Sequence, residues 1–303
     1  MSYTVLSLGE VLWDMIPGGA KPGGAPANFA YHAQILGANA AFLSAVGTDK
    51  LGDDLVEFFR LIGLSVELVQ RIPDFPTGTV GVDLDKDGKP KYTIHENTAW
   101  DNIACPSEAI EFAKKCDAVC FGSLASRSEV SRRSIRTILE NTRPETLKIF
   151  DLNLRAPFYQ KDVIDALLRS TNILKLNDEE ITILSEMFGV QASDPSEQAA
   201  WFLDNYGFSM LILTRGEHGS FLIRKVDGKI ETSDHPGIKV PQSEIADTIG
   251  AGDAFTAATV IGFMSGWPLD AINTTANKYA AYICTCPGAT PNVPEEYSNS
   301  ILH

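Results

Sequence analysis

The residues with the clearest chemical potential lie near the C-terminal end, where positions 247–255 read DTIGAGDAF. Gly250, Ala251 and Gly252 let the backbone approach a ligand closely, and the apolar run that follows is long enough for a buried helix. The N–H groups at such a helix start bind anions, and Asp253 places a carboxylate beside them. Such amides, next to a carboxylate that accepts a hydroxyl proton, suit phosphoryl transfer. The alternative is an ordinary turn in which Asp253 caps the helix.

A second glycine-rich stretch precedes an expected helix near the N-terminus, where positions 17–26 read PGGAKPGGAP. Its second glycine pair, Gly23 and Gly24, allows a close backbone approach to a ligand, and Asn28 follows within the first helical turn. Asp14 lies just before this stretch, in a short strand with alternating side chains. Its carboxylate can hydrogen-bond a sugar hydroxyl; the alternative is a solvated acid on a strand.

Composition narrows the class of protein. The chain has 303 residues and a net charge of −14, and its runs of Lys and Arg are no longer than two residues, so no nucleic-acid partner is expected. Its five cysteines match no zinc pattern and are expected to be reduced, which favours a cytoplasmic location. No apolar run reaches the length of a membrane span and no signal-peptide pattern opens the sequence, so no membrane partner is expected.

Strand and helix patterns alternate along most of the chain, which predicts the fold class. Short apolar strands separated by helices are typical of an α/β fold with a mostly parallel central sheet and helices on both faces. We expect one such domain over residues 1–303, with ligands beyond the carboxyl ends of the strands. The expected strands are 3–8, 40–46, 117–121, 147–153, 172–176 and 210–214, with a hairpin at 220–231, and the expected helices are 26–36, 51–62, 129–141, 162–170, 178–188, 197–206, 254–264 and 269–284.

Residues 77–103 break this alternation. Two β-rich runs within residues 79–94 flank a polar turn at 85–88, which predicts a hairpin. Together with residues 10–17, the hairpin is expected to form a small β-sheet that stands off the main domain and closes over a ligand as a lid. Trp100, near its end, either stacks on a sugar face or packs the lid onto the domain.

Polar side chains follow two of the expected strands. Asp151 and Arg155 come at the end of one strand, and Asn177 opens the helix after the next. Asn177 and Glu180 are three residues apart, so they share one helical face and can hold a hydrated Mg²⁺. The alternative is an Asn cap followed by acids that favour the helix dipole.

Two common nucleotide-binding motifs are excluded. Residues 47–52 have the glycine spacing of a P-loop, but Asp53 and Asp54 stand where Lys and Ser or Thr are required. No GxGxxG pattern follows the first strand, which argues against a nicotinamide-binding Rossmann domain.

The order of these parts resembles the ribokinase, or PfkB, family of carbohydrate kinases, and the resemblance spans essentially the whole chain. One motif reads GGAPAN at 23–28, with LGA at 36–38 and GTDKLGD at 47–53, and is similar to the family's sugar-binding motif. The other is DTIGAGDAF at 247–255, which is similar to its catalytic motif. The resemblance implies a ribokinase-like fold.

The resemblance also implies roles for individual residues. Asp253 would be the general base, and the backbone of residues 250–252 would form the anion hole. A monovalent cation such as K⁺ often lies beside that anion hole, near Asp247. The sugar contacts would be Asp14, Gly23, Gly24 and Asn28; the contacts to Mg²⁺ through water would be Asn177 and Glu180; and the ATP contacts would be Thr214, Gly216, Gly219, Asn277 and Gly288.

Within the family, the patterns ExLWD at 10–14 and DxNxR at 151–155 look most like fructokinases, with Arg155 approaching the transferred phosphate. A sugar phosphate or sugar acid would require Arg or Lys at the acceptor site, where this chain offers mainly acids. We therefore expect an ATP- and Mg²⁺-dependent kinase of the 6-hydroxyl of fructose. The alternatives are a kinase of another small sugar or sugar acid, such as 2-keto-3-deoxygluconate or ribose, and a sugar-binding regulator without catalysis.

Two features are left open by the sequence. The run CTCP at 284–287 departs from the commonest ending in the family, so the adenine side is not defined. Edge strands of the lid can pair with a second chain, so a dimer through residues 77–100 is a hypothesis.

Overall fold

The computed structural model describes residues 2–16, 19–84 and 90–302. Within these ranges, nine strands form a central sheet in the order β13-β12-β11-β10-β9-β8-β1-β4-β5. Pairs from β5 to β11 are parallel, whereas β12 and β13 run antiparallel, so the predicted mostly parallel sheet is confirmed. The strands are β1 (Thr4–Leu8), β4 (Asn39–Gly47), β5 (Val69–Ile72), β8 (Ala118–Gly122), β9 (Leu147–Asp151), β10 (Ile173–Asn177), β11 (Met210–Thr214), β12 (Ser220–Val226) and β13 (Lys229–His235).

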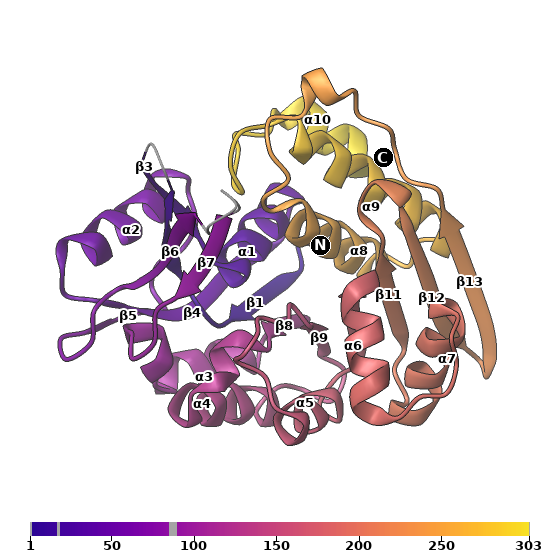
Figure 1. The fold of residues 1–303 in the computed structure, drawn as a ribbon, viewed down its shortest axis with the longest axis horizontal. Coiled ribbons are helices and arrows are strands. Elements are labelled where there is room, and N and C mark those ends of the chain that lie inside the picture. The colour runs from indigo at the N-terminus through magenta and orange to yellow at the C-terminus, as the bar shows by residue number, and fades with distance from the viewer. Residues whose placement is uncertain (1, 17–18, 85–89, 303) are drawn as a thin grey trace.

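Helices cover both faces of this sheet (Figure 1). Helices α1, α2, α8, α9 and α10 pack on one face, and α3 to α7 pack on the other. Neighbouring strand residues alternate between the two apolar clusters, as Val5 and Leu6 do, which explains why the strands are apolar throughout. The helices are α1 (Ala25–Ile35), α2 (Lys50–Leu61), α3 (Ser107–Ala113), α4 (Glu129–Glu140), α5 (Lys161–Leu168), α6 (Asp178–Phe188), α7 (Pro195–Tyr206), α8 (Ala251–Met264), α9 (Leu269–Cys284) and α10 (Glu295–Leu302).

Three elements of the main domain were not predicted from the sequence: β5, α3 and α10. Each is short, and a short segment gives too few repeats for hydrophobic periodicity to identify it. None of the helices in the described ranges is both long and apolar enough to cross a membrane.

A separate sheet of four strands, here called the small sheet, has the order β3-β2-β6-β7 and confirms the expected second sheet. Its strand β3 was not predicted, because its glycines and proline indicated a turn. Pro22 is tolerated there because β3 is an edge strand, where a missing N–H breaks no ladder. Residue 17 and the turn at 85–88, which the prediction included, lie outside the described residues. The strands are β2 (Leu12–Ile16), β3 (Gly19–Gly23), β6 (Gly78–Leu84) and β7 (Pro90–Ile94).

Candidate active site

The parallel topology brings the polar strand ends to one edge of the central sheet. Asp151 is the last residue of β9, Asn177 of β10 and Thr214 of β11. Glu10 follows the end of β1, which lies in the same parallel array. The carboxyl ends of parallel strands are where ligands of such sheets bind.

The two glycine-rich motifs meet at a single hydrogen bond. Asn28, in the first turn of α1, donates its Nδ2 to Asp253 Oδ2 of α8 at 2.8 Å, across 225 positions of sequence. Burial raises the pKa of Asp253 to about 7, and the negative charge of Asp151 adds to the shift. A carboxyl group with a pKa near neutrality is suited to accept a proton from a substrate hydroxyl.

The expected anion hole lies at the start of α8. Gly250 caps the helix in a left-handed conformation with φ of 79°, and a Cβ there would stand 2.7 Å from the Ala289 Cα. Only glycine fits this position, since any side chain would clash with the neighbouring backbone. The first N–H groups of a helix have no acceptor within the helix, so this turn presents donors to an anion.

A buried ion pair lies next to this turn. Lys175 Nζ, from β10, lies 3.0 Å from Asp151 Oδ1, and Thr256 Oγ1 of α8 lies 2.9 Å from Asp151 Oδ2. A Cβ on Gly252 would stand 3.4 Å from the same Nζ. Sequence reasoning missed Lys175, although a lysine between Leu174 and Leu176 in an apolar strand was a usable signal.

The expected sugar contacts gather where the small sheet meets the domain. A Cβ on Gly23 would stand 2.7 Å from Asp14 Oδ2, and a Cβ on Gly24, whose φ is +125°, would stand 2.5 Å from the Glu10 carbonyl oxygen. Burial raises the pKa of Asp14, and burial raises the pKa of Glu10 to about 7. The positive charge of Arg155 opposes both shifts.

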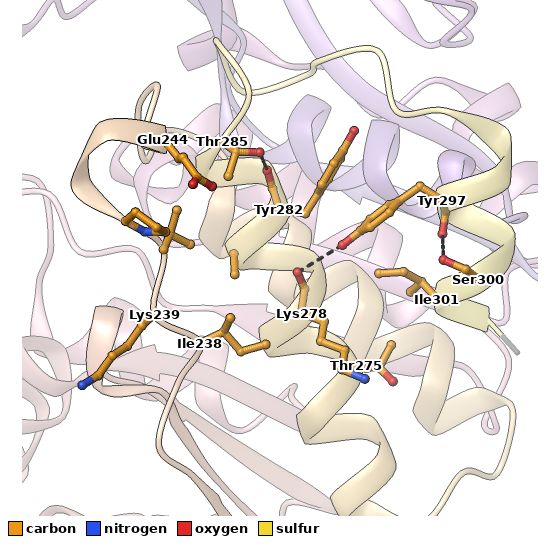
Figure 2. A pocket seen from close by; sticks show the side chains of 13 residues that line it. Ile238, Lys239, Glu244, Thr275, Lys278, Tyr282, Thr285, Tyr297, Ser300 and Ile301 are labelled. Atoms are coloured by element: carbon orange, nitrogen blue, oxygen red, sulfur yellow. Dashed lines mark hydrogen bonds between the residues drawn. The ribbon is translucent and has the colours of Figure 1, made fainter.

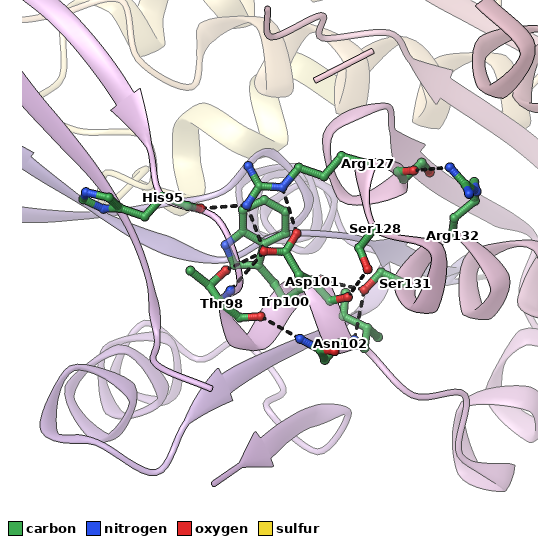
Figure 3. A network of polar contacts seen from close by, with 11 residues as sticks. His95, Thr98, Trp100, Asp101, Asn102, Arg127, Ser128, Ser131 and Arg132 are labelled. Carbon is green, nitrogen blue, oxygen red and sulfur yellow. Dashed lines mark hydrogen bonds and ion pairs between the residues drawn. The ribbon is translucent and has the colours of Figure 1, made fainter. Parts of the chain in front are cut away.

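Of the two roles that the sequence allowed for Trp100, stacking on a sugar or packing onto the domain, its position fits the second. Its side chain is fully buried and lies under Arg127, whose Cζ is 4.0 Å from the ring centroid (Figure 3). Arg127 forms a buried ion pair with Asp101 at 2.8 Å and donates to the His95 carbonyl oxygen at 2.7 Å. In this conformation Trp100 offers no face to a sugar. It packs the end of the small-sheet segment onto the domain, which was the alternative interpretation.

Asn177 and Glu180 form a capping box at the start of α6. Asn177 Oδ1 accepts from the Glu180 N–H at 2.8 Å, and Glu180 Oε2 accepts from the Asn177 N–H at 2.9 Å. Glu180 Oε1 also accepts from the Leu154 N–H at 2.7 Å. The described residues contain no cluster of three or more His, Cys, Asp or Glu that could hold a metal directly. These oxygens fit Mg²⁺ only through water, because direct coordination would compete with the cap.

The expected nucleotide contacts are only partly brought together. Gly216 and Gly219 lie in and after the short turn that follows β11. Gly288 donates its N–H to Asp247 Oδ2 at 2.8 Å, next to the anion hole. Asn277, in contrast, is buried and donates to Ser220 Oγ at 2.7 Å, so it fastens α9 to β12.

A pocket of about 670 Å³ lies between α9, α10 and the segment after β13, and sequence reasoning did not find it (Figure 2). The rings of Tyr282 and Tyr297 stack at its wall with centroids 3.9 Å apart. Lys239 and Lys278 also line it. Glu244 and Thr285 also line it, and between them and Asp247 the Ala246 N–H donates to the Cys284 carbonyl oxygen at 2.9 Å.

Comparison with known proteins places this geometry in a family. The profile of the pfkB family carbohydrate kinases matches residues 18–296. The fructokinase of Salmonella typhimurium is 28% identical over 97% of both chains, and "Probable fructokinase-5" of Arabidopsis thaliana is 27% identical over 96% of this chain and 94% of its own. The sugar kinase PH1459 from Pyrococcus horikoshii, solved in complex with ATP, is 26% identical with a TM-score of 0.81, covering 98% of this chain and 100% of that one. The chain belongs to the pfkB family of carbohydrate kinases.

Proposed function

We propose that this carbohydrate kinase is a fructokinase, which transfers the γ-phosphoryl group of ATP to the 6-hydroxyl of fructose. The observation that carries the chemistry is the hydrogen bond between Asn28 and Asp253, which joins the expected sugar motif to the expected base. The choice of fructose is supported by relatives named fructokinase and by the acids Glu10 and Asp14 on the acceptor side.

Each protein group has a defined task in this reaction. The Asp253 carboxylate accepts the proton of the sugar 6-hydroxyl, and the hydroxyl oxygen forms a bond to the γ-phosphorus of ATP. At the same time the bond from that phosphorus to the β,γ-bridging oxygen breaks, and ADP leaves. The N–H groups of residues 250–252 hold the charge on the moving phosphoryl group. The positive charge of Arg155 lowers the pKa of Asp253, and its guanidinium is proposed to meet the charge on the phosphoryl group. Mg²⁺, when bound with the nucleotide, neutralises phosphate charge, and Asn177 and Glu180 would hold it through water.

The pocket in Figure 2 is the site we propose for the adenine of ATP. It offers stacked aromatic rings and two lysines, and its lining residue Glu244 lies three positions before Asp247 in the chain. The turn with Thr214, Gly216 and Gly219 would line the phosphates. The monovalent cation expected near Asp247 stays a prediction; Lys21 Nζ lies 3.6 Å from that carboxylate.

The small sheet is proposed to close over the sugar, since a closed site keeps water from the γ-phosphate. Its edge strand β7 is the surface for the hypothetical dimer through residues 77–100. Light scattering at assay concentration tests the dimer, and a monomer there would remove it.

One observation favours a second substrate class, the sugar acids such as 2-keto-3-deoxygluconate. Arg155 acts on both Glu10 and Asp14, so a cation is present on the acceptor side and could meet a substrate carboxylate. Lys21 also lowers the pKa of Asp14, and Arg127 lowers that of Glu10, so the relatives named fructokinase are the reason that a neutral sugar is preferred here.

ADP release with ATP, Mg²⁺ and a panel of neutral sugars, sugar acids and sugar phosphates tests the proposal. High turnover on fructose alone is the expected result. Turnover on a sugar acid would keep the kinase chemistry and replace the substrate. No turnover on any sugar, with sugar binding still measurable, would favour the non-catalytic regulator.

A further inference from the structure

A charged pair lies beneath the anion hole and takes no part in the reaction as derived so far. Lys175 and Asp151 are 9% and 6% exposed, and their Nζ and Oδ1 atoms are 3.0 Å apart. Thr256 Oγ1 lies 2.9 Å from both Asp151 Oδ2 and the Gly252 carbonyl oxygen. The pair therefore connects β9 and β10 to the first turn of α8.

Stability alone does not explain why this pair is present. A buried ion pair is often no more stabilising than apolar residues of the same volume, because both charges lose their hydration. The flanking residues Leu174 and Leu176 are fully buried, so an apolar side chain at position 175 would suit the strand. A lysine at this place points to a requirement for charge.

The position of the ammonium group indicates what that requirement is. A Cβ on Gly252 would stand 3.4 Å from Lys175 Nζ, so the ammonium group lies next to the backbone of the anion hole. Asp253 is the next residue after Gly252. Asp151 raises the pKa of its carboxyl group, and Lys175 lowers it. The groups that act on or bind the Asp253 carboxyl are Asp151 of β9, Lys175 of β10, Arg155 after β9, Glu10 after β1, Cys120 of β8 and, by a hydrogen bond, Asn28 of α1.

We propose that Lys175 is a positioning residue for phosphoryl transfer: held by Asp151, it supports the Gly252 turn from beneath and balances the charge next to Asp253. The inference rests on the proposed role of Asp253 as the general base. It adds that a buried pair from two other strands adjusts the proton affinity of this base, which burial raises, and neither the motif nor the helix start contains that pair.

The test is the pH dependence of kcat/KM for the sugar at saturating ATP. Asp151→Asn keeps the shape of the side chain and removes a negative charge near Asp253. Because Asp151 raises the pKa of Asp253, this variant should lower that pKa. The acid limb, which is the part of the profile where kcat/KM falls as the pH decreases, should therefore move to lower pH. The expected shift is roughly one unit for charges a few ångströms apart at an effective dielectric constant near 20. The double variant Asp151→Asn with Lys175→Met removes both charges and should move the limb only part of the way back toward the wild-type position, because Asp151 acts on the pKa of Asp253 more strongly than Lys175 does. Its kcat should stay about tenfold or more below wild type because the turn has lost its support.

Thr256→Val is the matched control. It disturbs the same contact with Asp151 without changing any charge, so kcat falls while the acid limb keeps its position. A limb that stays in place or moves to higher pH in Asp151→Asn would overturn the inference. Full activity in Asp253→Ala would instead refute the proposed base, so the two failures are distinguishable.

Discussion

The two sides of the site differ in how completely their polar groups are paired. On the phosphate side, Asp151, Lys175 and Thr256 are buried and bonded to one another. On the acceptor side, Glu10 Oε2 and Arg127 Nη1 are buried without a hydrogen-bond partner in the described part of the chain. A buried polar atom without a partner costs free energy. The cluster of Asp151, Lys175 and Thr256 beneath the anion hole is thus preformed, whereas the acceptor side, like Arg215 Nε in the turn after β11, keeps hydrogen-bonding capacity for a ligand.

The largest expected effect on activity comes from Asp253, which lies where the phosphate side meets the acceptor side and accepts a hydrogen bond from Asn28. Asp253→Ala should lower kcat by about 10²- to 10⁴-fold because the general base is lost, while sugar affinity stays near normal. ADP release measures the first quantity and calorimetric titration with sugar the second. Asp270→Ala, an exposed acid in the first turn of α9, is the control and should leave both unchanged. Normal turnover in Asp253→Ala would contradict the assigned role.

The buried contacts of Arg127 with Asp101 and Trp100, which fasten the end of the small-sheet segment to the domain, should matter mainly for stability. Arg127→Ala leaves Asp101 buried and unpaired and removes the cation above Trp100, so the free energy of unfolding should fall by about 3–5 kcal/mol. Denaturant unfolding measures the change. Arg133→Ala breaks the exposed pair with Glu129 and should change stability by less than about 0.5 kcal/mol. Equal losses in the two variants would show that burial of the first pair is unimportant.

The wild-type pH profile should report the phosphate side. Because burial raises the pKa of Asp253 to about 7, the carboxyl is protonated below that pH and cannot accept the substrate proton. We expect kcat/KM to fall about tenfold per unit on the acid side of this pKa. Direct measurement of ADP avoids pH effects on coupling enzymes. An activity that stays constant down to about pH 5 would mean that the base has an ordinary aspartate pKa.

The smallest effect is expected at the contact between the two sides. Lys21 of β3 lies 3.6 Å from Asp247 and is 43% exposed, so this pair is worth little in water. Lys21→Ala should change kcat/KM less than about fivefold. A much larger loss, measured by the same ADP assay, would show that the ion pair holds the small sheet closed.

Residue patterns were sufficient for the main features of the fold and for the two glycine-rich motifs, which the structure brings together through Asn28 and Asp253. The apolar strands and amphipathic helices indicated the parallel sheet, and the break at residues 77–103 indicated a second sheet. They were insufficient for β3. Its glycines and proline indicate a turn from local backbone preferences, whereas the strand forms because it pairs with β2, a contact that local preferences do not contain. They also left Trp100 undecided between a sugar contact and a packing role, and they assigned Asn277 to ATP, whereas its side chain is buried and donates to Ser220.

The sequence by itself determined the candidate residues, which are the glycine turns and Asp253. It also determined the order of strands and helices, which follows from local backbone preferences and hydrophobic spacing. Only the tertiary structure decided that Asn28 bonds to Asp253, that Lys175 lies under Gly252 and that Trp100 is buried. The physical reason is that proton affinity and burial depend on charges and surfaces brought together from distant segments. A local pattern does not contain them.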